Sequence, residues 1–145
     1  MATVKGVNRT KCDDPSPSNI LTPGSVGGNV KVMIDQYTAA ALASGSVIQV
    51  GRKLPKGAKV LEVILGYAAL GASSTLGFGD AESTVRYISQ VSTASAGVTR
   101  LNSQAGIGYE TDESESATLD TELQILTAGA SITGLVYVAV FYTFE

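Results

Sequence analysis

Residues 54–67, LPKGAKVLEVILGY, and residues 75–80, TLGFGD, decide the fold of this chain. Pro55 and Gly57 supply the fixed and the permissive φ of a tight turn, so the run after them predicts a strand entered from that turn. After a loop rich in Gly and Ser, the second segment alternates larger side chains with glycine and predicts a second strand.

The two predicted strands differ in what their faces carry. Leu61, Val63 and Leu65 fall on one face of the first strand. In the second strand, Gly77 and Gly79 leave one face almost without side chains, so another backbone or side chain can approach it closely. We expect the two strands to be antiparallel neighbours.

Length and composition exclude several classes of function. A chain of 145 residues buries about 70% of the surface that its unfolded form exposes, so it can form a core without disulfides or metals. The single Cys12 excludes an internal disulfide and a Cys-cluster zinc site, and the missing His removes the commonest general base. We therefore expect no catalytic residues, no cofactor and no metal.

Hydropathy and charge limit the partners. The longest apolar stretch, residues 135–144, is shorter than the roughly 20 residues of a membrane helix, and the N-terminus has no hydrophobic signal segment, so we expect synthesis in a cytoplasm. Residues 1–60 carry eight Lys or Arg and three Asp, whereas residues 61–145 carry two Arg and ten acidic side chains. Such polarity suits docking on a complementary protein, although accidental segregation explains it equally well. The acidic net charge disfavours nucleic acid.

Residues 1–28 resemble an arm in composition, and residues 29–145 the folded domain. The first segment contains three of the four prolines and little that can be buried. Lys5, Arg9 and Lys11 are placed where an arm can contact a neighbouring subunit or surface. The alternative is a frayed terminus without a partner.

Local patterns predict the remaining elements. Val30, Val32 and Ile34 alternate with polar or larger residues and predict a strand with its apolar side inward. Residues 37–44 could form two turns of helix closed by glycine, as a connector. The other elements expected are a strand at 46–50, a helical turn at 83–88, a surface loop at 89–99, a short strand around Tyr109 and an amphipathic strand at 119–125.

The last strand, residues 135–144, is apolar on both faces. Such a strand is central and is covered on both sides, by a second sheet and by a neighbouring subunit. Tyr137, Phe141 and Tyr142 are therefore the candidate subunit-interface residues. Seven or eight strands at short spacing predict an all-β sandwich or jelly roll, with an up-and-down barrel as the alternative.

Two groups of carboxylates were weighed as sites. Residues 110–116 form an acidic loop that could hold Ca²⁺ through oxygen ligands, but they lack the spacing of an EF-hand, and a solvated loop is the simpler interpretation. Asp80 and Glu82 could form a glycosidase pair, although acids at the end of a strand usually cap turns.

Five segments together resemble the decoration or cement proteins of tailed-bacteriophage heads. They share the small residues, the turn and the glycine-alternating strand of that family, and they read VKVMIDQYTAA (30–40), SGSVIQVG (44–51), KLPKGAKV (53–60), TLGFGD (75–80) and VAVFYT (138–143). The resemblance covers residues 28–145.

The resemblance implies a β-sandwich or jelly-roll subunit on the outer capsid surface, commonly a homotrimer, that contacts the major capsid protein and bridges neighbouring capsomers. It implies no catalytic residue. Another virion part, such as a head fibre base or tail component, and a carbohydrate-binding jelly-roll module remain as alternatives.

Overall fold

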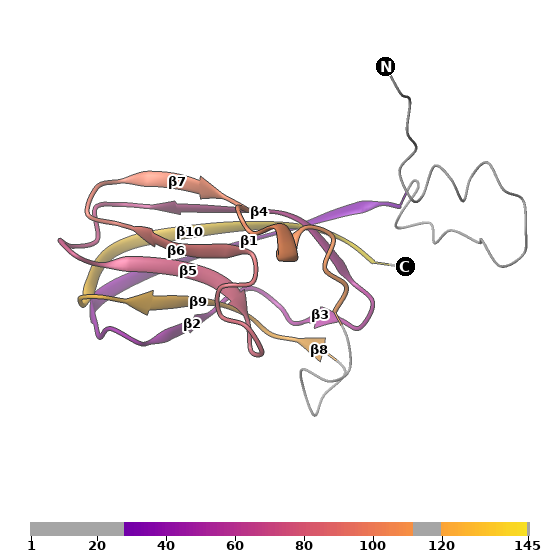
Figure 1. Ribbon diagram of the computed structural model, residues 1–145, viewed down its shortest axis with the longest axis horizontal. Helices are drawn as coiled ribbons and strands as arrows, with labels where there is room; N and C mark the ends of the chain where they lie inside the picture. The colour runs from indigo at the N-terminus through magenta and orange to yellow at the C-terminus, as the bar shows by residue number, and fades with distance from the viewer. Residues whose placement is uncertain (1–27, 112–119, 145) are drawn as a thin grey trace, which may run out of the picture.

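The computed structural model describes residues 28–111 and 120–144, which form a sandwich of two antiparallel four-stranded sheets (Figure 1). This arrangement confirms the predicted all-β sandwich class. The described residues contain one 3-10 helix, η2 (Gln104–Gly106), and no α-helix.

The strands divide evenly between the two sheets. Sheet A contains, in order across it, β1 (Val30–Leu42), β10 (Ile132–Thr143), β4 (Lys59–Tyr67) and β7 (Gly97–Arg100). Sheet B contains β2 (Val47–Gln49), β9 (Leu123–Ala128), β5 (Thr75–Asp80) and β6 (Ile88–Ser92). The remaining two strands, β3 (Leu54–Pro55) and β8 (Asp120–Thr121), pair with each other.

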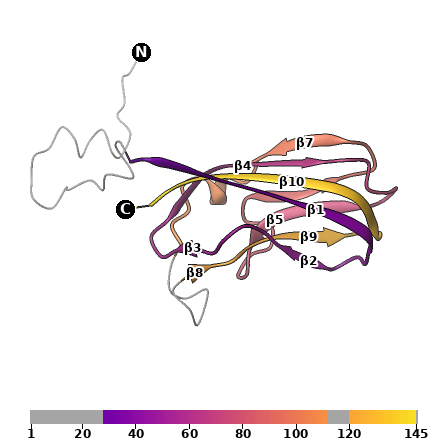
Figure 2. The same ribbon diagram turned by 180° about the vertical axis from the view of Figure 1, so that it is seen from behind.

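The chain winds between the sheets through loops at one end of the sandwich, which we call the tip (Figures 1 and 2). The tip loops are residues 43–46, 68–74, 93–96 and 129–131. Each of them joins strands in opposite sheets: β1 to β2, β4 to β5, β6 to β7 and β9 to β10. The opposite end, where β1 begins and β10 ends, is called the base.

Apolar side chains from both sheets fill the space between them. Val63 and Leu65 of β4 face Leu76 and Phe78 of β5, and all four are fully buried. The ring of Phe78 lies 6.0 Å from that of Tyr87, centroid to centroid. Burial of side chains of this size contributes about 1.5–3 kcal/mol each, which makes this layer the main source of stability.

The expected pairing of the first two strands is wrong. β4 pairs with β10 and β7, whereas β5 pairs with β9 and β6, so β4 and β5 face each other across the core. The loop between them crosses the tip, where the Leu70 amide donates to the Thr93 carbonyl at 2.9 Å and the Leu70 carbonyl accepts from the Thr133 amide at 3.0 Å. Two strands with alternating buried side chains can either pair in one sheet or face each other from opposite sheets. The sequence pattern is the same in both cases and could not distinguish them.

Leu61 does not share the inward face expected for it. Phe141 is opposite Glu62 and Tyr142 is opposite Val60, so Leu61 is the extra residue of a β-bulge and is 39% exposed. A bulge reverses the alternation on its own strand. Val60 therefore takes the inward position before the bulge.

Three local predictions are also wrong. Residues 37–42 continue β1, because β10 offers them a pairing partner as far as Ile132. Residues 83–86 form a turn, with the Arg86 amide donating to the Ser83 carbonyl at 3.1 Å, and no helix. Most of residues 89–99 lies in β6 and β7, edge strands whose small polar side chains face solvent.

Two weaker predictions match only in part. The short strand expected around Tyr109 is a single bridge between Lys59 and Glu110. Of the strand expected at 119–125, residues 120–121 belong to β8 and residues 123–125 to β9, where Gln124 is buried together with Leu123 and Ile125, so this part is not amphipathic.

The glycine face of β5 is approached closely, as predicted. A Cβ atom at Gly79 would overlap the carbonyl oxygen of Ser83, and one at Gly77 would lie 2.8 Å from Cγ1 of Val85. The turn after β5 therefore folds back over the strand, at a distance that side chains would prevent.

We expect Gly79→Ala to lower the free energy of unfolding by about 3 kcal/mol, because the added methyl group must displace the backbone of the turn. Gly66→Ala is the matched control: its Cβ would lie 3.8 Å from Cβ of Tyr137, an ordinary contact, and should change stability by less than about 1 kcal/mol. Urea denaturation followed by circular dichroism measures both variants. Equal stabilities would contradict the close approach.

Candidate assembly surface

The side of sheet A that faces away from sheet B, here called the outer face, is built by residues that lie opposite one another on neighbouring strands. Side chains opposite one another in an antiparallel pair share a face. Across β1, β10 and β4 the rows are Val32, Phe141 and Glu62; Ile34, Ala139 and Ile64; and Gln36, Tyr137 and Gly66. The last two rows continue onto β7 through Arg100 and Val98.

β1 presents its apolar side to solvent, contrary to the sequence prediction. Val30, Val32 and Ile34 are 59%, 55% and 72% exposed, and together we call them the ridge. The inward positions are taken by Met33, whose sulfur accepts from the Arg52 amide at 3.1 Å, and by Asp35, whose Oδ2 accepts from the Gly51 amide at 2.7 Å.

These inward contacts explain the reversal. The start of β1 lies over the connection between β2 and β3, where the Gly51 and Arg52 amides donate to the inward side chains of Asp35 and Met33, while Met33 also packs against the core. The register is set by those contacts together with the β10 pairing.

A groove opens at the other edge of the outer face, between β10, β4 and β7. It has a volume of about 490 Å³, and its walls include Tyr67, Val98, Leu135 and Tyr137. Gly66 leaves its floor without a side chain, whereas a Cβ at Gly97 would lie 3.1 Å from the Tyr67 hydroxyl oxygen. The hydroxyl groups of Tyr67 and Thr99 lie 3.2 Å apart and share a hydrogen bond, so this polar group is satisfied.

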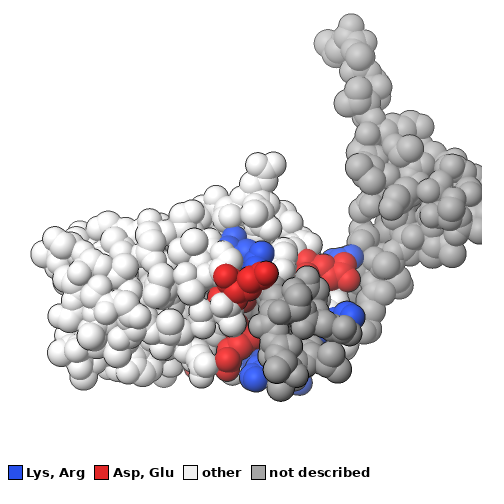
Figure 3. All heavy atoms as spheres, turned by 60° about the horizontal axis from the view of Figure 1, so that its bottom comes forward, with Lys and Arg blue, Asp and Glu red and all other residues white. Residues whose placement is uncertain are grey.

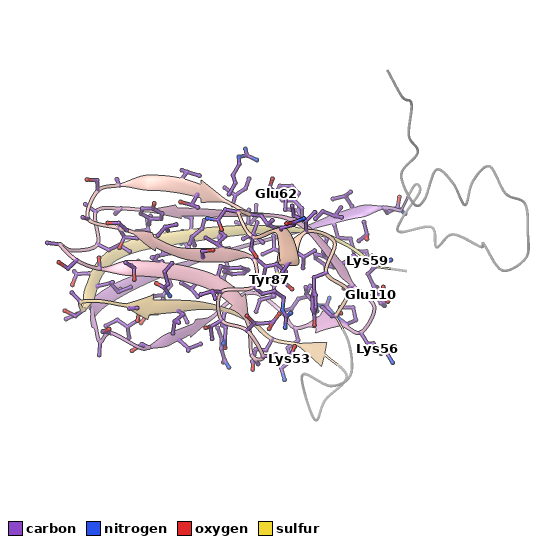
Figure 4. The ribbon with its side chains drawn as sticks, in the orientation of Figure 1. Lys53, Lys56, Lys59, Glu62, Tyr87 and Glu110 are labelled. Atoms are coloured by element: carbon purple, nitrogen blue, oxygen red, sulfur yellow. The ribbon has the colours of Figure 1, made fainter. Side chains whose placement is uncertain are left out.

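The outer face carries Lys59 in the row of Val30 and Thr143, and a pair of opposite charges further along the sheet. Nη1 of Arg100 lies 3.5 Å from Oε2 of Glu62, and Oε1 of Glu62 accepts from the Leu101 amide at 3.2 Å. Figure 4 labels Glu62 at this face and the core residue Tyr87 between the sheets. Glu62 and Arg100 neutralise each other, and Lys59 is paired with Glu110, so the centre of the face between ridge and groove has no net charge.

Charged side chains gather at the base, which Figure 3 shows against a white tip. The four tip loops contain no charged residue. Lys53, Lys56, Lys59 and Glu110 all lie toward the base (Figure 4), where Nζ of Lys59 is 3.4 Å from Oε2 of Glu110. The sandwich therefore has a charged end and an uncharged end.

Asp80 and Glu82, weighed above as a glycosidase pair, share one arginine. Nε of Arg86 lies 2.5 Å from Oδ2 of Asp80, and its Nη2 lies 2.5 Å from Oε2 of Glu82. Oδ1 of Asp80 accepts from the Ser83 amide at 2.8 Å, and the Arg86 guanidinium stacks 3.8 Å from the Tyr109 ring centroid.

This cluster holds the turn in place. Asp80 is fully buried and both of its carboxylate oxygens are occupied by donors of its own chain. The arrangement supports the turn-cap interpretation and leaves no general acid or nucleophile facing a cleft. Arg86 and Tyr109 were missed in the sequence, since nothing in their spacing indicates that they meet.

Comparisons with known proteins indicate the family to which the chain belongs. No protein-family model matches it, and no curated protein matches it in sequence. Among solved structures, a chain in the capsid asymmetric unit of cyanophage Pam1 is 30% identical, with a TM-score of 0.68 over 87% of this chain and 93% of that one. The chain belongs to a family of phage head structural proteins.

Two further capsids share the fold with this family member. A chain in the capsid of Ralstonia phage GP4 has a TM-score of 0.64 at 18% identity, covering 81% of this chain and 86% of that one. A chain in the acidic stable capsid of Helicobacter pylori bacteriophage KHP30 has a TM-score of 0.56 at 14% identity, covering 79% and 87%. Both likenesses concern the fold alone.

The predicted interface residues of this head protein divide between two environments. Tyr137, 49% exposed, and Phe141, partly buried, lie together on the outer face. Tyr142 is 8% exposed and packs in the core, so its side chain is not available to a neighbouring subunit. Lys5, Arg9 and Lys11 lie outside the described residues.

Most of the acidic loop 110–116 also lies outside the described residues. Within residues 28–111 and 120–144, no three acidic or Cys side chains are placed to hold a metal ion together. In the same part of the chain, no helix has the length and hydropathy needed to cross a membrane.

Replacing Arg86 should be far more costly than replacing Arg100. Arg86→Met leaves the buried Asp80 carboxylate without its counter-charge, which costs about 3–5 kcal/mol of the free energy of unfolding. Arg100→Met removes an exposed pair and should cost less than about 1 kcal/mol. Urea denaturation of the two variants measures the difference, and similar losses would argue against a structural role for the Arg86 cluster.

Proposed function

We propose that this head protein is a decoration or cement protein, which binds the outer surface of the phage head and bridges neighbouring capsomers. The observation that carries the proposal is the 30% identity to a chain of the Pam1 capsid asymmetric unit over most of both chains. The described residues also offer no catalytic arrangement, so we assign the function to the surfaces of the sandwich.

Two surfaces are suited to two kinds of contact. The charged base is the end where β1 begins, and the segment with Lys5, Arg9 and Lys11 precedes that strand in the sequence. We assign contact with the major capsid protein to this end and to residues 1–28, since charge complementarity fixes the register of a docked protein. A protein that binds only the assembled lattice stabilises it by mass action, and many copies multiply the effect.

The apolar outer face is suited to contact between copies of this chain. Tyr137 and Phe141 are its aromatic members, and aromatic side chains are enriched where protein interfaces are buried. We therefore favour a homo-oligomer, and a trimer in particular, as the unit that binds the head.

Two other functions predict different locations and ligands. A head fibre base or tail protein would occupy another part of the virion, which cryo-EM of the particle would reveal. A carbohydrate-binding module usually needs exposed aromatic platforms, and this chain has no Trp. A glycan array tests that alternative directly.

Deleting residues 1–28 should abolish binding to heads while leaving the sandwich folded, because the sheet pairing begins at Val30. The measurement mixes purified protein with undecorated heads, sediments the heads and determines bound copies per particle, with circular dichroism to verify the fold. Full-length protein should saturate the heads.

A second variant isolates the role of charge. Replacing Lys5, Arg9 and Lys11 with Ser keeps the length of the arm and removes its cations, and should weaken head binding at moderate salt. Unchanged occupancy with the truncated protein would count against the arm, and no binding of the full-length protein to any head surface would count against decoration.

A further inference from the structure

We infer that the ridge of one copy, formed by Val30, Val32 and Ile34, docks in the groove of a second copy beside Val98 and Tyr137. The inference rests on the proposed self-association and specifies which surfaces meet. It follows from the shape, chemistry and placement of the two features on the same face.

The outward side chains of the ridge are apolar, whereas the solvent-facing side of an edge strand is usually polar. Its three aliphatic side chains point away from the sandwich and are more than half exposed, while the inward positions hold Met33 and Asp35. Single exposed apolar residues are ordinary, but a row of three on the outward side of an edge strand indicates a surface that is covered by another protein.

The groove is a matching hollow. Its floor at Gly66 has space for a partner side chain, because even an added Cβ would find nothing nearer than 3.8 Å. The side chains around it carry no charge, and the Tyr67 hydroxyl is already bonded to Thr99. An aliphatic side chain can therefore enter without leaving a buried polar group unpaired.

Ridge and groove lie at opposite corners of the outer face. The ridge is on the edge strand β1, near the base, and the groove is bounded by the other edge strand, β7, near the tip. A ridge cannot reach the groove of its own copy, but it can reach that of a second copy. Repeated contact of this kind closes a dimer if it is reciprocal, or a larger ring if it runs head to tail.

The face between the two features is large and neutral enough to complete the contact. Strands about 4.8 Å apart and residues about 3.4 Å apart give the four strands, between Leu135 and Thr143, an area of about 500 Å². A standard interface covers about 800 Å² per partner, so this face supplies more than half of one. Phe141, Ala139 and Ile64 lie between ridge and groove, and the Glu62–Arg100 pair leaves no net charge to bury.

Cysteine cross-linking tests the contact in the full-length chain with Cys12→Ser as background. Copies carrying Ile34→Cys and differently tagged copies carrying Val98→Cys are co-expressed, purified and treated with a short bis-maleimide. We expect cross-linked pairs that contain both tags, and none when Ile34→Cys is replaced by Gln49→Cys, an exposed position on β2 of the other sheet. Each copy carries one cysteine, so a covalent pair that contains both tags supports the inference.

A substitution pair measures the strength of the contact. Ile34→Ser removes the most exposed ridge side chain and should raise the Kd for self-association at least about tenfold. Ile107→Ser is the matched control, since Ile107 is 65% exposed but lies in the loop after η2 and not on sheet A. Sedimentation velocity gives the Kd, and circular dichroism verifies that both variants fold.

The outcomes separate this inference from the proposed function. An oligomer without the mixed cross-link, a monomeric wild-type protein, or equal Kd values for the Ile34 and Ile107 variants would overturn the ridge-and-groove contact, even if the protein still binds heads. An intact cross-link in a protein that binds no head would overturn decoration and leave the contact standing.

Discussion

Strand β10 is apolar on both faces, but the sandwich covers only one of them. Its inward side chains Val136, Val138 and Val140 pack against sheet B and are at most 3% exposed, while Tyr137 on the other face is 49% exposed. The strand is held between β1 and β4 by pairing on both edges, so it cannot rotate to hide the second face. The neighbouring strands β1, β4 and β7 extend this unburied side into the outer face.

β1 adds an apolar row to one edge of this exposed face, so the two edges of the face differ. Its pairing with β10 fixes which side chains face outward, and the Asp35 contact to Gly51 gives the polar inward position a partner. An apolar ridge therefore stands on one edge of the sheet, while Gly66 of β4 leaves a hollow near the other. Charged side chains gather at the base, where the ridge also lies, whereas the groove lies near the uncharged tip.

Features that depend on the local alternation of side chains could be predicted from the sequence. Features that depend on which strands pair could not. The all-β class, the apolar last strand and the glycine face of β5 follow from side-chain order alone. The partner of β4, the bulge at Leu61 and the extension of β1 depend on β10, which is distant in the sequence. β6 and β7 were predicted as a surface loop because their residues are mostly small or polar. Edge strands with one solvated face need few large apolar side chains.

The candidate assembly surface could also be predicted only where local alternation determines it. Tyr137 and Phe141 could be chosen because strand alternation places them together, whereas Tyr142, one residue further, belongs to the core. The outward ridge contradicts the usual rule that apolar sides face inward, and only the inward contacts of Met33 and Asp35 explain it. A sequence that violates that rule without losing its fold leaves an apolar surface exposed, and this exposed surface is the observation on which the proposed contact between copies depends.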